Sequence, residues 1–194
     1  MGTGDESQDE DVNLMQRIAA GEEAAFSRLV DKHQYAVHGT IARMTNHSPD
    51  TPDLAQEVFL RVWKSARRYQ PRAKFTTWLF TITRNLVFNY SSKKSRHREE
   101  SLEEKEDGWH QQQAVDRSAT PDHRLQQAEM KKQVDQAIAS LPEKQRLAVI
   151  LRRQEKMPYE EIAVILNLSI PAVKSTLFRA RNALREALAP YLTD

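Results

Sequence analysis

The stretch that most constrains the fold of this 194-residue chain is an acidic, polar segment near its middle, residues 99–122. It reads EESLEEKEDGWHQQQAVDRSATPD and carries eight acidic side chains, two basic ones and few apolar ones. Such a composition buries too little apolar surface to offset the conformational entropy lost on folding. We therefore predict a flexible linker here, with one small domain of about 70–90 residues on either side.

The charge pattern on either side of this segment suggests a polyanionic partner. Residues 11–98 carry 15 basic and seven acidic side chains, and residues 123–194 carry 12 basic and eight acidic ones. Basic blocks of this kind suit nucleic acid, although an ordinary charged surface explains the first block equally well and is the preferred explanation of the second. Residues 1–10 hold four acidic and no basic side chains, so we expect an acidic disordered tail there.

The composition also argues against several classes of function. There is no cysteine, which excludes a disulfide, a thiolate nucleophile and a cysteine-based zinc site. The six histidines lack metal-ligand spacing and there is no glycine-rich phosphate loop, so we expect no enzyme, no catalytic residue, no metal and no other cofactor. The acidic start is unlike a signal peptide, and no apolar run reaches the roughly 20 residues of a membrane span. We expect a cytoplasmic protein without membrane insertion.

The first basic block has the spacing of a helical domain. Apolar residues recur every three or four positions over residues 11–20, 22–44, 53–66 and 75–98. Thr51 before Pro52 is a typical helix start, with Thr51 as the cap. The last segment is rich in β-branched and aromatic residues that favour strands, but its length and apolar spacing favour a helix.

The second block has proline and cap signals for further helices. Thr120-Pro121 predicts one helix start, and Pro142 and Pro158 predict two later restarts. The polypeptide between these signals again has helical spacing. The predicted fold class is therefore all-α, with two small helical domains joined by the acidic linker.

The end of the second block matches the steric pattern of a helix-turn-helix. A small residue, Ala163, lets the second helix cross the first, and Asn167 four positions later tolerates the left-handed backbone of the turn. Val173, six positions further on, anchors the second helix. Ser169 can cap that helix, and Pro171 then falls in its first turn.

The second helix of this motif combines an apolar stripe with a basic face. Lys174, Ser175, Phe178 and Arg179 project away from the stripe. A phenylalanine among cations suits a thymine methyl group, with lysine and arginine on guanine edges and phosphates. The alternative is a plain amphipathic helix whose basic face is only solvated.

The first block contains a second candidate for nucleic-acid contact, FTTWLFTITRN, which follows the basic loop KSARRYQPRAK. Aromatic rings interleaved with cations can stack unpaired bases and hold their phosphates. The alternative is that the aromatic residues of the segment form a core. Of the aromatic residues, Tyr69 in the polar loop is the one least expected to be buried.

Three segments together resemble the extracytoplasmic-function sigma factors of bacteria. These segments are DLAQEVFLRVW, FTTWLFTITRNLVFNY and the stretch LPEKQRLAVILRRQEKMPYEEIAVILNLSIPAVKSTLFRARNALRE, and they resemble sigma regions 2.2, 2.3–2.4 and 4. The resemblance implies a region 2 domain over residues 11–98, the linker over 99–122 and a region 4 domain over 123–194. Asn167 stands where this family commonly has glycine, and Pro171 where a small residue is frequent.

The resemblance implies a role for three sets of residues. Those expected to grip the clamp helices of the largest subunit of core RNA polymerase are Asp53, Gln56, Glu57 and Leu60. Those expected to capture the minus-ten promoter element are Arg67, Arg68, Tyr69, Lys74, Thr77, Trp78 and Asn85. Those expected to read the minus-thirty-five element are Lys174, Ser175, Phe178, Arg179 and Arg181.

The resemblance further implies three partners: core polymerase, promoter DNA and an anti-sigma factor. The second domain would also contact the flap of the second-largest polymerase subunit, and the linker would pass near the RNA exit path. Two other functions stay open at this stage. One is a helix-turn-helix regulator that binds duplex DNA as a dimer, and the other is an adaptor that sequesters another factor.

Overall fold

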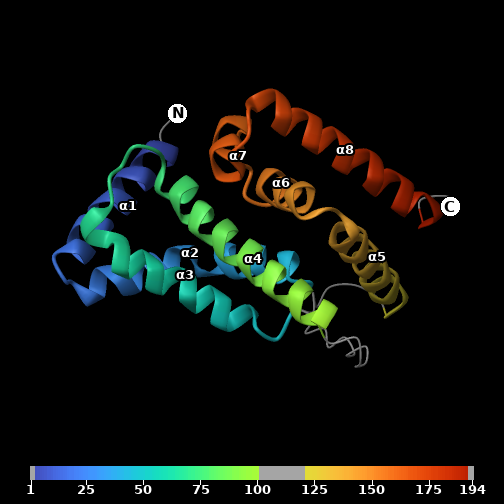
Figure 1. Ribbon diagram of the computed structural model, residues 1–194, viewed down its shortest axis with the longest axis horizontal. Helices are drawn as coiled ribbons and strands as arrows, with labels where there is room; N and C mark the ends of the chain where they lie inside the picture. Colours follow the sequence, from blue (N-terminus) through green and yellow to red (C-terminus); the bar gives the residue numbers. More distant parts are fainter. Residues whose placement is uncertain (1–2, 101–120, 192–194) are drawn as a thin grey trace.

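The computed structural model describes residues 3–100 and 121–191, and within these ranges all regular structure is helical (Figure 1). The all-α fold is thereby confirmed. The elements are, in chain order, α1 Thr3–Ala19, α2 Glu23–Met44, α3 Thr51–Ser65, η1 Ala66–Arg68, α4 Phe75–Glu100, α5 Pro121–Ser140, α6 Glu143–Arg153, α7 Tyr159–Leu166, α8 Ile170–Leu188 and η2 Ala189–Tyr191.

Helices α1 to α4 form the first domain, in which α2 packs on α1, α3 and α4. Its core holds Leu14, Leu29, Val58 and Leu79, each at most 2% exposed. The segment that begins at Phe75 is a helix, because its apolar spacing lets one face bury against the bundle. That long-range packing outweighs the strand preference of its threonines and aromatic residues.

Helix α1 includes most of the segment that was expected to be a disordered tail. It begins at Thr3, so the expectation of disorder for residues 1–10 is wrong where the structure describes them. Cations on α2 face two acidic residues of α1, Glu10 and Asp11. Glu10 accepts hydrogen bonds from Arg28 at 3.2 Å and from Lys32 at 2.8 Å, and the bond from Lys32 lowers the pKa of Glu10.

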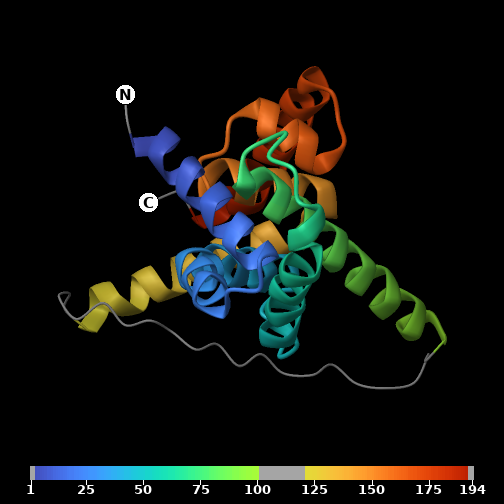
Figure 2. The ribbon, with the colours of Figure 1, turned by 90° about the vertical axis from the view of Figure 1, so that its left-hand side faces the viewer.

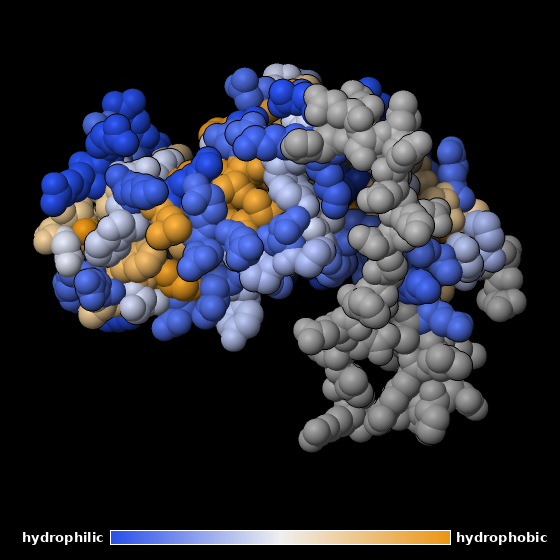
Figure 3. All heavy atoms as spheres, turned by 60° about the horizontal axis from the view of Figure 1, so that its bottom comes forward, coloured by the Kyte–Doolittle hydropathy of each residue, from blue (hydrophilic) through white to orange (hydrophobic). Residues whose placement is uncertain are grey.

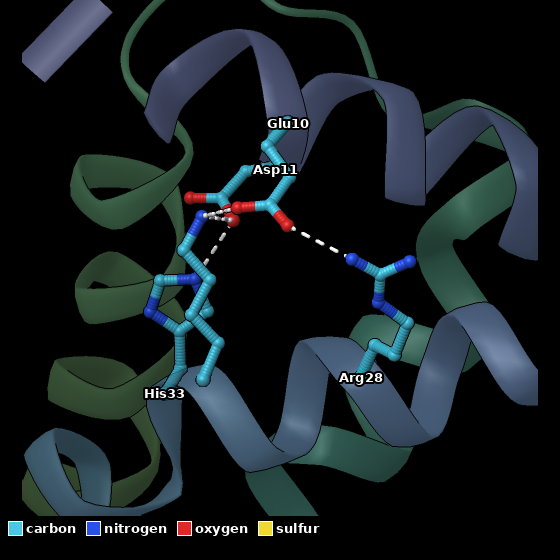
Figure 4. A network of polar contacts seen from close by, with 5 residues as sticks. Glu10, Asp11, Arg28 and His33 are labelled. Carbon is cyan, nitrogen blue, oxygen red and sulfur yellow. Dashed lines mark hydrogen bonds and ion pairs between the residues drawn. The ribbon is translucent and has the colours of Figure 1, made fainter. Parts of the chain in front are cut away.

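A buried carboxylate strengthens the same junction (Figure 4). Asp11 is 2% exposed, and its Oδ1 lies 2.7 Å from Nζ of Lys32 and 3.1 Å from Nε2 of His33. A buried carboxylate is tolerated when it is paired and hydrogen-bonded. These contacts tie α1 to α2 next to the domain core.

Two expected boundaries differ slightly in the structure. The cap of α3 is Asp50 and not Thr51, because the Thr51 hydroxyl donates to the carbonyl of Ser48 at 2.7 Å and Thr51 is already helical. The expected linker over 99–122 overlaps the last turn of α4 and the first turn of α5. Its remaining residues, 101–120, lie outside the described part of the chain.

The second domain consists of α5 to α8, as the proline and cap signals predict. Its core holds Leu147, Ile150, Ile162, Ile165 and Val173 from three successive helices. The helices α6, α7 and α8 each pack on the other two. The apolar face of each helix is thereby buried within the domain.

The two domains pack against each other in this structure. Helix α4 lies on α7, and α2 lies on α5 and α6. Nη1 of Arg146 in α6 donates to the carbonyl of Met44 at 2.8 Å, and the same guanidinium also binds the carbonyls of Ala139 and Leu141. A cavity of about 210 Å³ lies at this junction, lined from both domains. The sequence did not predict this arrangement.

The buried carboxylate offers a test of how α1 is held. Asp11→Asn keeps the side-chain size but removes the charge that faces Lys32 and His33. We expect the free energy of unfolding to fall by about 1–3 kcal/mol, since a buried charged hydrogen-bond acceptor is lost. Urea denaturation measures this. The exposed Asp9→Asn is the control, and equal stability of the two variants would contradict the proposed anchoring.

We expect Glu155, at the junction of the domains, to make stability depend on pH. Burial raises the pKa of its carboxyl, and Arg43 opposes this in part. A raised folded-state pKa means that stability falls as pH rises from the unfolded pKa, about 4.3, to the folded one. Glu155→Gln should therefore raise the melting temperature relative to wild type at pH 7 and change it less at pH 4.

Thermal unfolding at the two pH values checks this, with the exposed Glu186→Gln as the matched control. A gain that is the same at pH 4 and pH 7 would show that ionisation of Glu155 is not the cause.

Candidate nucleic-acid interface

The turn between α7 and α8 has the geometry that the sequence predicts for a helix-turn-helix. Asn167 is left-handed, with φ 53° and ψ 55°. The amide of Leu168 donates to the carbonyl of Ala163 at 2.9 Å and thereby closes the end of α7. Ala163 is 8% exposed, so its small side chain lies inside the domain. The turn, and with it the motif, is confirmed.

The start of α8 also follows the prediction. The Ser169 hydroxyl accepts a hydrogen bond from the amide of Ala172 at 3.3 Å, and Pro171 lies in the first turn. Val173, Leu177 and Ala180 form the buried stripe, which faces the rest of the second domain. The buried stripe fixes the rotation of α8 about its own axis, and thereby determines which residues form the opposite face.

The opposite face of α8 is open to solvent. Phe178 is 59% exposed, and Lys174 and Arg179 are exposed beside it. Ser175 and Arg181 are also exposed, and Nε of Arg181 donates to the carbonyl of Leu177 at 3.4 Å. The structure therefore places all five predicted minus-thirty-five residues on the surface of one helix.

The left-handed turn residue can be tested directly. Asn167→Ala should lower the free energy of unfolding by about 1–2 kcal/mol, because a left-handed backbone is strained for alanine. Asn167→Gly should equal or exceed wild-type stability, since glycine adopts this conformation freely. Chemical denaturation distinguishes the two. Equal losses for alanine and glycine would indicate that the asparagine side chain, and not its backbone, matters here.

The loop of the first domain partly departs from expectation. Tyr69 packs against the core, with its ring centroid 4.9 Å from that of Trp78 and 6.1 Å from that of Phe75. Burial raises the pKa of its hydroxyl, and the charge of Asp11 adds to this. Tyr69 is thus partly buried and packs against the core, whereas Phe75 and Phe80 are themselves core residues at 1% and 2% exposure.

Several other predicted minus-ten residues are accessible. Arg67 and Arg68 are exposed in η1, and Asn85 is exposed on α4. Trp78 is half-buried and precedes Asn85 by seven positions, so both lie on the same side of the helix. The first domain thus exposes two guanidinium groups on η1, and an amide and part of an aromatic ring on one side of α4.

Two predicted minus-ten residues contact the second domain: Thr77 is buried there, whereas Lys74 stays partly exposed. Thr77 is 2% exposed, and its hydroxyl donates to Oε2 of Glu161 at 3.2 Å. Nζ of Lys74 lies 2.7 Å from Oε1 of the same carboxylate. The sequence does not single out Glu161. An acidic residue is common in the first turn of a helix, and the partners of Glu161 are more than 80 positions away in the chain.

The predicted polymerase-binding face is on α3. Asp53 and Gln56 are exposed, Leu60 is 42% exposed, and Glu57 pairs with Arg61 at 2.8 Å. Beside this face lies an apolar groove of about 570 Å³ between α2 and α3. Figure 3 shows apolar side chains gathered on one side of the α1–α4 half.

Sequence reasoning missed the α2 side of this groove. Tyr35 is 83% exposed there, although it sits in a helix whose opposite face is core. The sequence feature that indicates this side of the groove is Tyr35 itself, an aromatic residue outside the apolar stripe of α2. Val30 and Phe26 complete the wall on that helix.

Two features relevant to other functions were not found in the described residues. No group of three or more His, Asp or Glu side chains is placed to hold a metal ion within residues 3–100 and 121–191. In the same ranges no single helix has the length and apolar character of a membrane span. A bent pair, Tyr159–Leu166 with Ile170–Tyr191, passes that test jointly but turns by 94° at its break.

A helical bundle followed by a helix-turn-helix domain is the architecture of a protein that recognises DNA. Family models support a specific class: residues 29–97 match sigma-70 region 2, and residues 131–184 match sigma-70 region 4. The RNA polymerase sigma-H factor of Pseudomonas aeruginosa is 31% identical over 190 residues, which cover 97% of this chain and 98% of that protein.

The same class appears in other relatives. The ECF RNA polymerase sigma-E factor of Escherichia coli is 31% identical over 185 residues, covering 92% of this chain and 94% of that protein. The chain belongs to the extracytoplasmic-function group of the sigma-70 family.

Solved structures share the fold. RpoE of Bartonella quintana, in complex with the anti-sigma factor NepR, has a TM-score of 0.69 and 24% identity over 84% of this chain and 96% of that one. CnrH, in complex with the cytosolic domain of CnrY, has a TM-score of 0.67 and 23% identity over 93% of this chain and 98% of that one. At these identities the likeness concerns the fold alone.

Proposed function

We propose that this sigma factor binds core RNA polymerase, reads the minus-thirty-five and minus-ten elements of a promoter, and promotes DNA melting. The observation that carries the proposal is the α8 surface. An asparagine turn and a serine cap hold α8 so that Phe178 and the neighbouring cations face outward. Because the chain also contains a sigma region 2 domain, we assign this surface to contact with promoter DNA.

The α8 face suits the major groove. Lysine and arginine side chains donate to guanine edges and phosphates, while an exposed phenylalanine can contact a thymine methyl group. In this proposal Lys174, Ser175, Phe178, Arg179 and Arg181 recognise the minus-thirty-five element. Recognition by a helix of this kind fixes where the first domain meets the duplex.

The first domain supplies groups for unpaired bases. Arg67 and Arg68 can hold phosphates, and Trp78 and Asn85 offer an aromatic edge and an amide on one side of α4. Tyr69 supports Trp78 from behind through its ring contact. Capturing a flipped base offsets the few kcal/mol of unstacking, so binding energy drives the melting.

The α2–α3 groove suits an apolar helix with a polar flank. Leu60 and Tyr35 expose apolar surface at its edges, and Asp53, Gln56 and Glu57 lie along α3 beside it. Helix-in-groove recognition uses such a pairing of apolar anchors with a polar rim. We assign this groove to the clamp helices of the largest polymerase subunit, and contact with the flap of the second-largest subunit to the second domain.

The proposal includes an anti-sigma partner and a cytoplasmic location. The solved structures of RpoE and CnrH are complexes with NepR and with the cytosolic domain of CnrY. This chain shares their two-domain fold, which supports control of the same kind. The family match favours a sigma factor over a dimeric regulator that acts without polymerase, or over an adaptor.

The α8 contacts are tested by transcription with purified core polymerase. Wild-type protein should direct run-off transcription from a promoter found by sequencing transcripts after overexpression. Lys174→Ala and Arg179→Ala should each lose about 1–3 kcal/mol of promoter binding, since each removes one base or phosphate contact. The exposed Arg153→Ala on α6 is a matched charge control.

Promoter-specific initiation that survives both α8 substitutions would contradict the assignment of this face. A wild-type protein that gives no initiation with core enzyme, yet binds duplex DNA tightly by itself, would contradict the sigma function altogether.

The groove is tested by binding to core polymerase. Leu60→Asp should weaken that binding by about tenfold, because a charge is placed where an apolar anchor is buried. Since Leu60 is partly exposed, the fold should be retained, which circular dichroism checks. Asn89→Asp on the exposed side of α4 is the control. Unchanged affinity of Leu60→Asp would place the polymerase on another surface.

A further inference from the structure

The carboxylate of Glu161 joins the two domains at the predicted minus-ten site. It lies in the first turn of α7, and its side chain is 15% exposed. One oxygen pairs with Lys74 at 2.7 Å, and the other accepts from Thr77 at 3.2 Å. Figures 1 and 2 both show the start of α4 next to α7. The contact therefore connects residues that are 84 positions apart in the sequence.

The chemistry of this contact matches that of a nucleic-acid phosphate. A lysine ammonium and a hydroxyl donor are groups that proteins commonly place on phosphate oxygens. The Glu161 carboxylate presents two anionic oxygens to the same two donors. The buried hydroxyl of Thr77 has one proton to donate, so it cannot serve the carboxylate and a DNA phosphate at the same time, and Lys74 shares its charge with the carboxylate. The neighbouring Glu160, also in the first turn of α7, is exposed to solvent. An acidic residue at this end of the helix is therefore compatible with the fold without a contact to the first domain.

The other recognition face stays open in the same structure. Helix α8 packs on α5, α6 and α7, and Figure 1 shows it on the side of the second domain away from α1–α4. Phe178 and the cations beside it are exposed while Thr77 is covered. The packed arrangement is thus compatible with contact of α8 with duplex DNA and incompatible with full access to the minus-ten residues.

A pocket borders the contact between α4 and α7 around Glu161. The cavity of about 210 Å³ there is lined by Lys74, Glu155 and Glu161, among others. Two carboxylates and two lysines, Lys74 and Lys156, make this a polar, charged junction. Polar contacts of this kind between the domains of one chain are compatible with their separation.

We propose that Glu161 is an autoinhibitory latch that occupies Lys74 and Thr77 in the free protein, so that the domains must part before single-stranded promoter DNA binds. The inference rests on the proposed function, because it takes Lys74 and Thr77 as minus-ten residues. Its structural half, that Glu161 holds the domains together, does not depend on DNA.

The structural half is tested by measuring the distance between the domains. The chain has no cysteine, so Asn89→Cys on α4 and Ala183→Cys on α8 place spin labels at two exposed sites only. Double electron–electron resonance should give one narrow distance distribution for wild type. Glu161→Gln should add a broad, longer component, and Glu161→Lys, which sets a cation beside Lys74, should enlarge it. Glu160→Gln and Glu160→Lys are the matched controls.

Distributions that stay as narrow as wild type in both Glu161 variants would overturn the latch, whatever their DNA binding. The same holds if the Glu160 controls open the domains to the same extent, because the effect would then be one of overall charge.

The functional half is tested with fluorescent single-stranded DNA of randomised sequence, without polymerase. Glu161→Gln should bind it about fivefold more tightly than Glu160→Gln, as expected when a partly buried ion pair no longer competes. Equal affinities would overturn the masking of the site. If the Glu161 variants open the domains but neither they nor wild type binds single strands, the latch stands and the proposed minus-ten reading fails.

Discussion

The recognition surfaces of the first domain depend on the burial of α4. Phe75 and Leu79 fix this helix in the core, at 1% and 0% exposure, and thereby set the orientation of the half-buried Trp78 and the exposed Asn85. The same helix begins next to α7, where Lys74 and Thr77 meet Glu161. One helix thus carries the domain core, the candidate base-binding side chains and the contact with the second domain. A change in how α4 packs would alter all three.

Much of this could be predicted from the sequence because the signals are local. The left-handed Asn167, the Ser169 cap and the buried Val173 follow from steric rules that act within about ten residues. The helical state of the segment from Phe75 was harder to predict, because the strand propensity of its residues and the helical spacing of its apolar residues disagree. The apolar spacing predicted the correct state, since a long helix can bury one whole face against the bundle.

The rest depended on contacts between distant segments. The helical state of the acidic N-terminus needs the cations of α2, and a composition of acids alone does not reveal them. The ring contacts of Tyr69 with Phe75 and Trp78 join the loop after η1 to α4. Glu161 looked like an ordinary first-turn acid, and only the packing of α7 on α4 gives it partners. The polar linker correctly suggested two domains but carried no information on how they meet.

Permanganate reactivity of promoter thymines tests most directly whether this chain, together with core polymerase, melts a promoter. With core polymerase and the wild-type protein, thymines in the minus-ten region should become reactive, whereas neither component alone should have this effect. Trp78→Ala and Asn85→Ala should reduce the reactivity more than they reduce binding to core polymerase. Promoter DNA that remains unreactive with core polymerase and wild-type protein together would contradict a melting function for this chain.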